Sequence, residues 1–248
     1  MSAPAEPALQ VQALSKSFGD HRVLDAIDLQ IESGEVLALL GRSGTGKSVL
    51  LKLIVGLQQA DSGSIRVQGA QVRDATPRQL AEIRTHIGFL FQSAALYDAM
   101  TVEENVAFPL RRHRQMSGGK LRDQVRQLLA SVGMEGERTS MPAQISGGMR
   151  KRVGLARALA LSPDVLLFDE PTAGLDPLSA REIGELILAV QQQRNVAAVV
   201  VTHDVPLAQM IADRLMLMRD GRIVAAGTFS ELQRSSDRFV ADFLQVSP

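Results

Sequence analysis

The 248-residue sequence contains no cysteine, which excludes disulfide bonds, cysteine-ligated zinc and a thiol nucleophile. It has no tryptophan and a single tyrosine, so it offers few aromatic surfaces on which nucleic acid bases could stack. Lys+Arg and Asp+Glu both number 27, and the resulting net charge of zero provides no basic excess for binding a polyanion. Together these absences predict that nucleic acid is not a partner.

Long apolar runs are also missing. No stretch approaches the roughly 18 residues that a membrane-spanning helix requires. Residues 1–10 lack the basic region followed by an apolar core that marks a signal peptide. A role at a membrane would therefore depend on a partner protein. With 45% apolar and 22% charged residues, the chain is typical of one globular unit or of one with a large insertion.

One segment follows the pattern Gly-x4-Gly-Lys-Ser/Thr, the P-loop signature. The apolar run 36–40 before it is typical of a buried strand, and 49–55 after it is typical of a helix that ends near Gly56. A glycine loop between strand and helix presents backbone N–H groups to phosphate, whereas a plain glycine turn would not need the whole pattern. The predicted nucleotide-binding residues are Gly41, Arg42, Ser43, Gly44, Thr45, Gly46, Lys47, Ser48 and Val49.

Within this segment, Lys47 is expected to reach the β- and γ-phosphates and Ser48 to be a ligand of Mg²⁺. A second element of a phosphate site follows the apolar run 165–168, which ends in Asp169 and Glu170. Asp169 would hold Mg²⁺ through water, and Glu170 would orient or deprotonate the attacking water. Alone, such a pattern more often marks a simple strand end, but its position well beyond the P-loop favours the functional interpretation.

The remaining pattern predicts a doubly wound α/β core. Residues 9–40 are expected to form strands, with a hairpin turn at 18–21, and a helix should begin at Thr76-Pro77. The runs 165–168 and 197–201 are continuously apolar, as in central parallel strands. The predicted fold is α/β, with a P-loop NTPase core, an N-terminal antiparallel β subdomain and an inserted helical subdomain at 93–160. These form a single domain at 9–240, with short tails at 1–8 and 241–248.

A longer signature identifies the family. Residues 145–149 read Ile-Ser-Gly-Gly-Met, and a basic helical segment at 150–159 follows. A Ser-Gly-Gly turn that opens a helix forms an anion-binding N-terminus, although an isolated one, such as 117–119, is usually a loop. Together with the Asp-Glu strand that follows, the run resembles the signature of the ATP-binding cassette (ABC) family. The resemblance is collinear over about residues 9–230.

This resemblance implies further site residues. Gln92 matches the glutamine that senses Mg²⁺ and the γ-phosphate, and His203 matches a histidine that contacts the γ-phosphate. Phe18 resembles the aromatic residue that stacks on adenine, and Asp176 lies in a segment that crosses a dimer interface. The signature residues Ser146, Gly147 and Gly148 are implied to close over the ATP of a second copy. Met149 stands where many relatives have Gln, so contact of a side-chain amide with the opposite ribose is not implied.

The implied function is that of the ATPase subunit of a membrane transporter. Two copies would form a homodimer that binds ATP and Mg²⁺ and moves a multi-pass permease docked near Gln92. The subunit would lie on the cytoplasmic side of the inner membrane, held there by the permease. The alternative from another class is a soluble ATPase that acts on DNA or ribosomes. Such relatives usually carry two cassettes or a long coiled coil, and this chain has neither.

The cargo is indicated by resemblance alone. Segments 91–102 and 105–111, the signature with Met149, and 48–52 resemble the Mla/Mce-type phospholipid transporter ATPases. This implies transport of phospholipid between the inner and outer membranes, with an MCE-type lipid-binding protein and small accessory subunits as partners. The alternative cargo is a small polar solute, as in importers with similar cassettes. The cluster 111–114 is expected to be a solvated helix end, with contact to lipid headgroups or a permease as the alternative.

Overall fold

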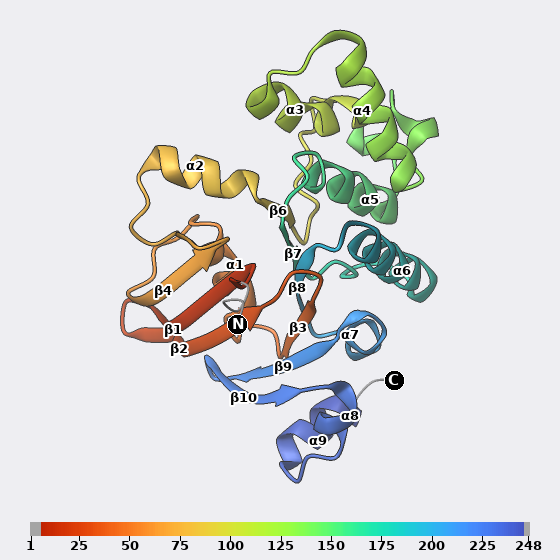
Figure 1. Ribbon diagram of the computed structural model, residues 1–248. Helices are drawn as coiled ribbons and strands as arrows, with labels where there is room; N and C mark the ends of the chain where they lie inside the picture. Colours follow the sequence, from red (N-terminus) through yellow and green to blue (C-terminus); the bar gives the residue numbers. More distant parts are fainter. Residues whose placement is uncertain (1–5, 246–248) are drawn as a thin grey trace, which may run out of the picture.

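Two β-sheets and a group of inserted helices make up residues 6–245, the part of the chain that the computed structural model describes (Figure 1). The strands are β1 (Leu9–Phe18), β2 (His21–Ile31), β3 (Val36–Gly41), β4 (Ser62–Val67), β5 (Ala70–Gln71), β6 (Ile87–Leu90), β7 (Val165–Asp169), β8 (Ala197–Thr202), β9 (Arg214–Arg219) and β10 (Arg222–Gly227). The helices are α1 (Lys47–Ile54), α2 (Pro77–Thr85), α3 (Val102–Arg114), α4 (Gly118–Ser131), α5 (Gly147–Ala158), α6 (Pro177–Arg194), α7 (Val205–Ile211), α8 (Phe229–Gln233) and α9 (Arg238–Gln245). The predicted α/β fold class is confirmed.

The larger sheet places the end of β3 near its middle. Its strand order is β10-β9-β3-β8-β7-β6, and β3 pairs in parallel with both β8 and β9. Every residue of β3, β7 and β8 is buried, which confirms that the apolar runs 165–168 and 197–201 belong to central parallel strands. Ligands of open α/β sheets bind beyond the carboxyl ends of such strands. The loop after β3 and the residues after β7 and β8 therefore meet at one edge.

The smaller sheet is antiparallel and has the order β2-β1-β4-β5. The predicted hairpin is confirmed, because Phe18 pairs with His21 across the turn. Strand β4 begins at Ser62, which pairs with Ser15 across an irregularity of β1. One apolar cluster lies between this sheet, α1 and the larger sheet. The smaller sheet is thus packed directly against the element that follows the P-loop.

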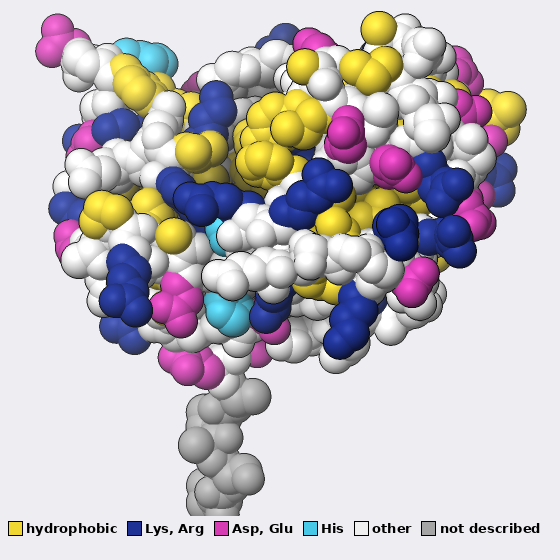
Figure 2. Space-filling model, turned by 90° about the horizontal axis from the view of Figure 1, so that it is seen from above, with side chains coloured by type: hydrophobic (Ala, Val, Ile, Leu, Met, Phe, Trp, Pro, Cys, Tyr) yellow, Lys and Arg dark blue, Asp and Glu magenta, His cyan; other side chains and the backbone are white. Residues whose placement is uncertain are grey.

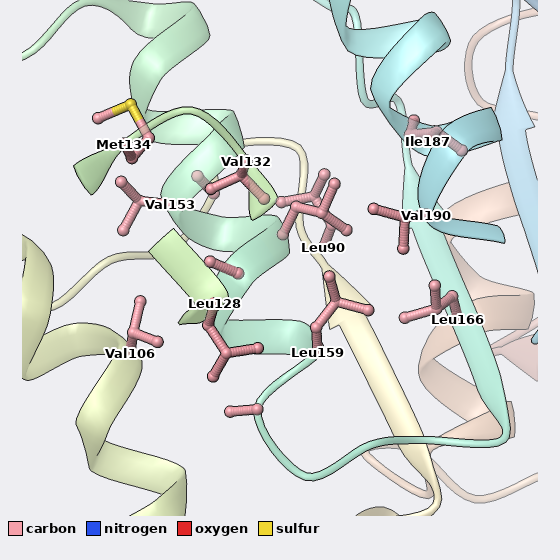
Figure 3. Close-up of a cluster of buried hydrophobic side chains, with 14 of the residues drawn as sticks. Leu90, Val106, Leu128, Val132, Met134, Val153, Leu159, Leu166, Ile187 and Val190 are labelled. Atoms are coloured by element: carbon pink, nitrogen blue, oxygen red, sulfur yellow. The ribbon is translucent and has the colours of Figure 1, made fainter. Parts of the chain in front are cut away.

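The inserted helices α3, α4 and α5 occupy the upper part of Figure 1. Residues 115–117 separate α3 from α4, but Gly118 and Gly119, which were expected to lie in a loop, already belong to α4. A continuous cluster of buried side chains extends from these helices to the larger sheet and α6 (Figure 3). The residues labelled there are Leu90, Val106, Leu128, Val132, Met134, Val153, Leu159, Leu166, Ile187 and Val190. The insertion therefore shares its core with the rest of the chain.

The C-terminal part extends the packed structure beyond the predicted limit at residue 240. Helix α9 buries Val240 and Leu244 in a cluster with β3, β9 and α7. Part of the expected tail at 241–248 is therefore helix, because α9 has an apolar face to bury; residues 246–248 lie outside the described range. At the other end Ala8, in the expected tail 1–8, is fully buried, and residues 1–5 lie outside that range. Among the described helices, none is long and apolar enough to cross a membrane.

Candidate functional site

The P-loop connects the end of β3 to the first turn of α1. Gly46 precedes α1 with φ at 100°, a left-handed conformation that side chains disfavour. A Cβ atom on Gly46 would lie 2.8 Å from the carbonyl oxygen of Val23, so the position also has no room for one. Because glycine has no capping side chain, the first N–H groups of α1 remain available to an anion. The local fold therefore forms a phosphate-binding helix terminus.

The ammonium group of Lys47 is folded back into this loop. The side chain is 5% exposed, and Nζ donates hydrogen bonds to the carbonyl oxygens of Gly41 at 2.7 Å and Arg42 at 3.1 Å. Nζ also lies 3.7 Å from Oε1 of Glu170. Burial lowers the pKa of Lys47, and the charges of Glu170 and Asp169 oppose that shift. A buried cation of this kind can compensate the charge of a bound phosphate.

Ser48 and Asp169 form a pair beside the P-loop. The hydroxyl of Ser48 donates to Oδ1 of Asp169 at 2.7 Å. Burial raises the pKa of Asp169, and the hydrogen bond from Ser48 opposes the shift. Within residues 6–245 no group of three or more His, Cys, Asp and Glu could enclose a metal ion. The donor set of Ser48 and Asp169 suits Mg²⁺, which usually takes one or two carboxylates together with waters and phosphate oxygens. A desolvated carboxylate next to a hydroxyl is a suitable partial ligand set.

Glu170 follows β7 with φ at 46°, which is unusual for a residue other than glycine. The hydroxyl of Thr202 donates to Oε2 of Glu170 at 3.1 Å, and Nδ1 of His203 lies 3.0 Å from the same oxygen. The carboxylate is 12% exposed, whereas the ring of His203 is 59% exposed. These contacts orient the carboxylate at the edge where β7 and β8 end. Sequence reasoning missed Thr202, although it lies directly before the predicted His203.

These elements line one cleft of about 440 Å³. The predicted residues that it brings together are Phe18, Ser43, Gly44, Gly46, Lys47, Ser48, Val49, Gln92, Glu170 and His203; Val23 also lines it and was not predicted. Phe18 is 48% exposed. The P-loop is completed by Gly41, Arg42 and Thr45. In it, the Thr45 hydroxyl donates to the Arg42 carbonyl oxygen at 2.9 Å. The cleft thus combines an aromatic ring, a phosphate-binding loop and an oriented carboxylate.

Four predicted residues lie away from this cleft. Ser146 caps α5, and its Oγ accepts a hydrogen bond from the N–H of Met149 at 3.2 Å. Asp176 caps α6 and accepts from the hydroxyl of Ser179 at 2.6 Å, a bond that is the main cause of its lowered pKa. Gly147 and Gly148 lie against the start of α6, since added Cβ atoms would be 3.5 Å from Leu175 and 3.8 Å from Ser179. The starts of α5 and α6 therefore form a separate group.

A second, mainly apolar groove lies beside the segment that carries Gln92. It has a volume of about 200 Å³, and its lining includes Phe89, Phe91, Tyr97, Phe108 and Arg157. The rings of Tyr97 and Phe108 are 5.1 Å apart, and both are partly exposed. On the face seen in Figure 2, apolar side chains gather in a central hollow with Lys and Arg side chains beside it. The cluster 111–114 lies nearby in the last turn of α3 and is exposed, as both a solvated helix end and a contact with headgroups or a permease require.

Comparison with known proteins places this arrangement in a family. The sequence profile described as "ABC transporter" matches residues 24–173. The chain is 41% identical to the probable ribonucleotide transport ATP-binding protein mkl of Mycobacterium leprae, over 97% of this chain and 70% of that one. It is 39% identical to the intermembrane phospholipid transport system ATP-binding protein MlaF of Haemophilus influenzae, over 96% and 90%. It is 44% identical to the sulfate/thiosulfate import ATP-binding protein CysA of Bordetella bronchiseptica, over 96% and 67%.

Solved structures of ATP-binding cassettes have the same fold as this chain. The ATP-binding cassette MJ0796, in a dimeric post-hydrolysis state bound to ADP and Pi, superposes with a TM-score of 0.81 at 31% identity, covering 89% of this chain and 98% of that one. The protein cbiO1 from Clostridium perfringens, part of the ABC transporter complex cbiONQ, gives a TM-score of 0.84 at 29% identity, covering 97% and 96%. The predicted resemblance is thereby confirmed. The chain belongs to the ABC transporter family and is one of its ATP-binding, ATP-hydrolysing cassettes.

Proposed function

We propose that this chain is the motor subunit of an ABC transporter that moves phospholipid between the inner and outer membranes. The observation that carries the motor role is the cleft in which Glu170 faces Lys47 and Ser48. The phospholipid cargo is supported by the likeness to MlaF, which extends over 90% of that protein. The likeness to CysA, at 44% identity, supports import of a small anion as the second candidate.

In the proposed reaction, the P-loop N–H groups and Lys47 bind the phosphates of ATP, while Phe18 stacks on the adenine. Ser48 and Asp169 would hold Mg²⁺ together with Gln92, and the ion would neutralise charge on the phosphate oxygens. Glu170 takes the proton of the attacking water, since Thr202 and His203 already orient its carboxylate. The ring of His203 is exposed and lines the cleft, where it would contact the γ-phosphate. Each role uses a group that lines or adjoins the same cleft.

The separate position of Ser146 supports a site shared between two copies. Ser146, Gly147 and Gly148 lie on the start of α5, outside the cleft of their own chain, next to Asp176 at the start of α6. In a homodimer they would cover the phosphates in the cleft of the partner copy, as an anion-binding helix terminus can. ATP would then favour the closed dimer because only that state satisfies both halves of the site. The dimeric state of MJ0796 supports this arrangement.

The groove lined by Phe89, Phe91, Tyr97 and Phe108 is proposed to receive the permease. It is apolar, partly exposed and adjacent to Gln92, so an occupant would contact the segment that senses nucleotide. A short amphipathic helix of a multi-pass permease fits a groove of this kind. Through the permease the chain would lie on the cytoplasmic side of the inner membrane, in a complex with an MCE-type lipid-binding protein and small accessory subunits. Nucleic acid has no part in this proposal.

The proposal is tested by purifying the chain from membranes with its associated subunits and reconstituting the complex in vesicles. We expect ATP-dependent transfer of a fluorescent phospholipid, with no ATP-dependent uptake of sulfate. Glu170→Gln is the matched control, because its amide cannot accept the proton: turnover should fall on the order of 10²-fold or more while ATP binding and the ATP-bound dimer persist. Sulfate uptake without lipid transfer would overturn the cargo assignment and leave the motor role. Normal turnover in Glu170→Gln would overturn the assignment of the base.

A further inference from the structure

Lys151 is a buried lysine to which the reaction described above assigns no part. It lies on α5 between Arg150 and Arg152, yet it is only 5% exposed, whereas Arg150 is exposed. Its Nζ donates to the backbone carbonyl oxygen of Gln92 at 2.5 Å and to that of Glu170 at 3.1 Å. A single side chain thus connects α5, the segment after β6 and the residue after β7. Both of the residues that it holds line the nucleotide cleft.

The backbone of Glu170 requires such support. A left-handed conformation in a residue other than glycine persists only where its surroundings fix it. The N–H of Glu170 donates to the carbonyl oxygen of Val201 at 2.9 Å, and the carboxylate is fixed by Thr202 and His203. The carbonyl oxygen accepts from Nζ of Lys151 at 3.1 Å and from the N–H of Ala173 at 3.2 Å. A hydrogen bond from α5 is therefore one of the contacts that fix this backbone.

Nearby charges also act on the ammonium group of Lys151. The carboxylates of Asp169 and Glu170 both favour the ammonium form of Lys151, while burial lowers the pKa of Lys151 to about 8. An ammonium group donates three hydrogen bonds and accepts none, so it suits a site made of carbonyl oxygens. Buried polar side chains are hydrogen-bonded in the great majority of cases. Lys151 finds its partners in the main chains of two cleft residues.

A second contact fixes the same segment further along α5. Arg157 donates to the carbonyl oxygens of Ala94 at 2.8 Å and Ala95 at 2.7 Å, and both alanines have left-handed backbones. Helix α5 therefore holds the segment 92–95 at both ends. A rotation of α5 would therefore disturb the hydrogen bonds to Gln92 and to Glu170 together. This joins the helix that starts at Ser146 to the hydrolytic end of the same chain's cleft.

We propose that Lys151 is a positioning residue for hydrolysis, which aligns Glu170 and Gln92 with the nucleotide and links their alignment to the orientation of α5. The inference rests on the proposed role of Glu170 as the base. Because Lys151 donates to the backbone carbonyl oxygens of Gln92 and Glu170 and lies outside the phosphate loop, it should affect the chemical step and leave nucleotide affinity unchanged. A misplacement of about 1 Å in such an array can cost on the order of 10²-fold in rate.

The test compares Lys151→Met with Lys151→Arg in the full chain, and Lys120→Met, an exposed lysine of α4, is the matched control. We expect Lys151→Met to lose roughly 10²-fold in kcat while its KM and its Kd for ATP without turnover change by less than about twofold. Lys151→Arg keeps the charge and the donors, so it should recover most of the lost kcat. Lys120→Met should match the wild type in every measurement.

A folded Lys151→Met with wild-type kcat overturns the proposal. So does an equal loss of ATP affinity and kcat, because that would show collapse of the nucleotide site. If Lys151→Met does not fold, Lys151→Gln, which can still donate to one carbonyl oxygen, is judged by the same two criteria. Glu170→Gln is assayed in parallel. If it retains turnover, the base assignment fails; if it is inactive while Lys151→Met is normal, only the positioning role fails.

Discussion

Replacing Asn105 by leucine should release the loop that presents Tyr97 to the apolar groove. Asn105 lies on α3 and is fully buried. Its Oδ1 accepts from the N–H of Tyr97 at 2.8 Å, and its Nδ2 donates to the carbonyl oxygens of Tyr97 at 3.2 Å and Met100 at 3.1 Å. Leucine has a similar size but can replace none of these bonds. The substitution therefore removes hydrogen bonds with little change in packed volume.

The expected cost follows from which groups lose their partner. The carbonyl oxygen of Tyr97 keeps its bond from the N–H of Met100 at 3.1 Å. The N–H of Tyr97 and the carbonyl oxygen of Met100 lose the bond that Asn105 provides. Each buried group left unsatisfied costs about 1–3 kcal/mol, and the loop can recruit water because Tyr97 is 46% exposed. We expect the free energy of unfolding to fall by about 2–4 kcal/mol.

Urea unfolding measures this loss, and hydrogen exchange of the Tyr97 amide locates it. The hydrogen-bond partners of Asn105 do not line the cleft, so ATP turnover of the isolated subunit should persist, while stimulation by the permease should decline. Gln127→Leu, on the exposed side of α4, controls for the added apolar surface. The reasoning is refuted if Asn105→Leu stays within about 0.5 kcal/mol of the wild type and its Tyr97 amide is equally protected.

Two further substitutions test the description of the fold and the cleft. Gly46→Ala should weaken ATP binding by roughly tenfold or more, because alanine at this φ costs about 1–3 kcal/mol and its Cβ atom would meet Val23. An ATP affinity within about twofold of the wild type, measured by calorimetry, would contradict this prediction. Asp61 accepts from Lys16, which most strongly lowers its pKa below 3.8. Its contribution to stability is present above pH 3.8 and lost as pH falls through the lowered pKa. Asp61→Asn should reduce that acid-dependent loss in urea unfolding; an unchanged pH profile would contradict the assignment.

The contiguous elements were predictable because their geometry is local. The P-loop needs only a strand, a glycine turn and a helix in succession, and the sequence supplies all three between 36 and 55. The apolar runs that became β7 and β8 were equally clear. Gathering Phe18, Gln92 and His203 around that loop required the family resemblance, since no periodicity joins positions so far apart. The structure then placed all three in one cleft.

Other features depend on tertiary contacts that no local pattern reveals. Lys151 lies in a run of basic residues that is typical of a solvated helix face, and only packing against the segment after β6 shows that it is buried. Thr202 became part of the site because β8 ends beside β7. Helix α9 was missed as part of the domain because its apolar face has meaning only against the neighbouring elements.

The shared core of Figure 3 determines how this protein should unfold. Leu128 and Val153 of the insertion belong to the same buried cluster as Leu166 of the larger sheet and Ile187 of α6. Because these side chains form one continuous buried cluster, separating the insertion would expose apolar side chains on both sides at once. Loss of the insertion and loss of the larger sheet should therefore be a single cooperative transition. The insertion, whose helix α5 is proposed to align Glu170 and Gln92, therefore also contributes to the heat resistance of the larger sheet.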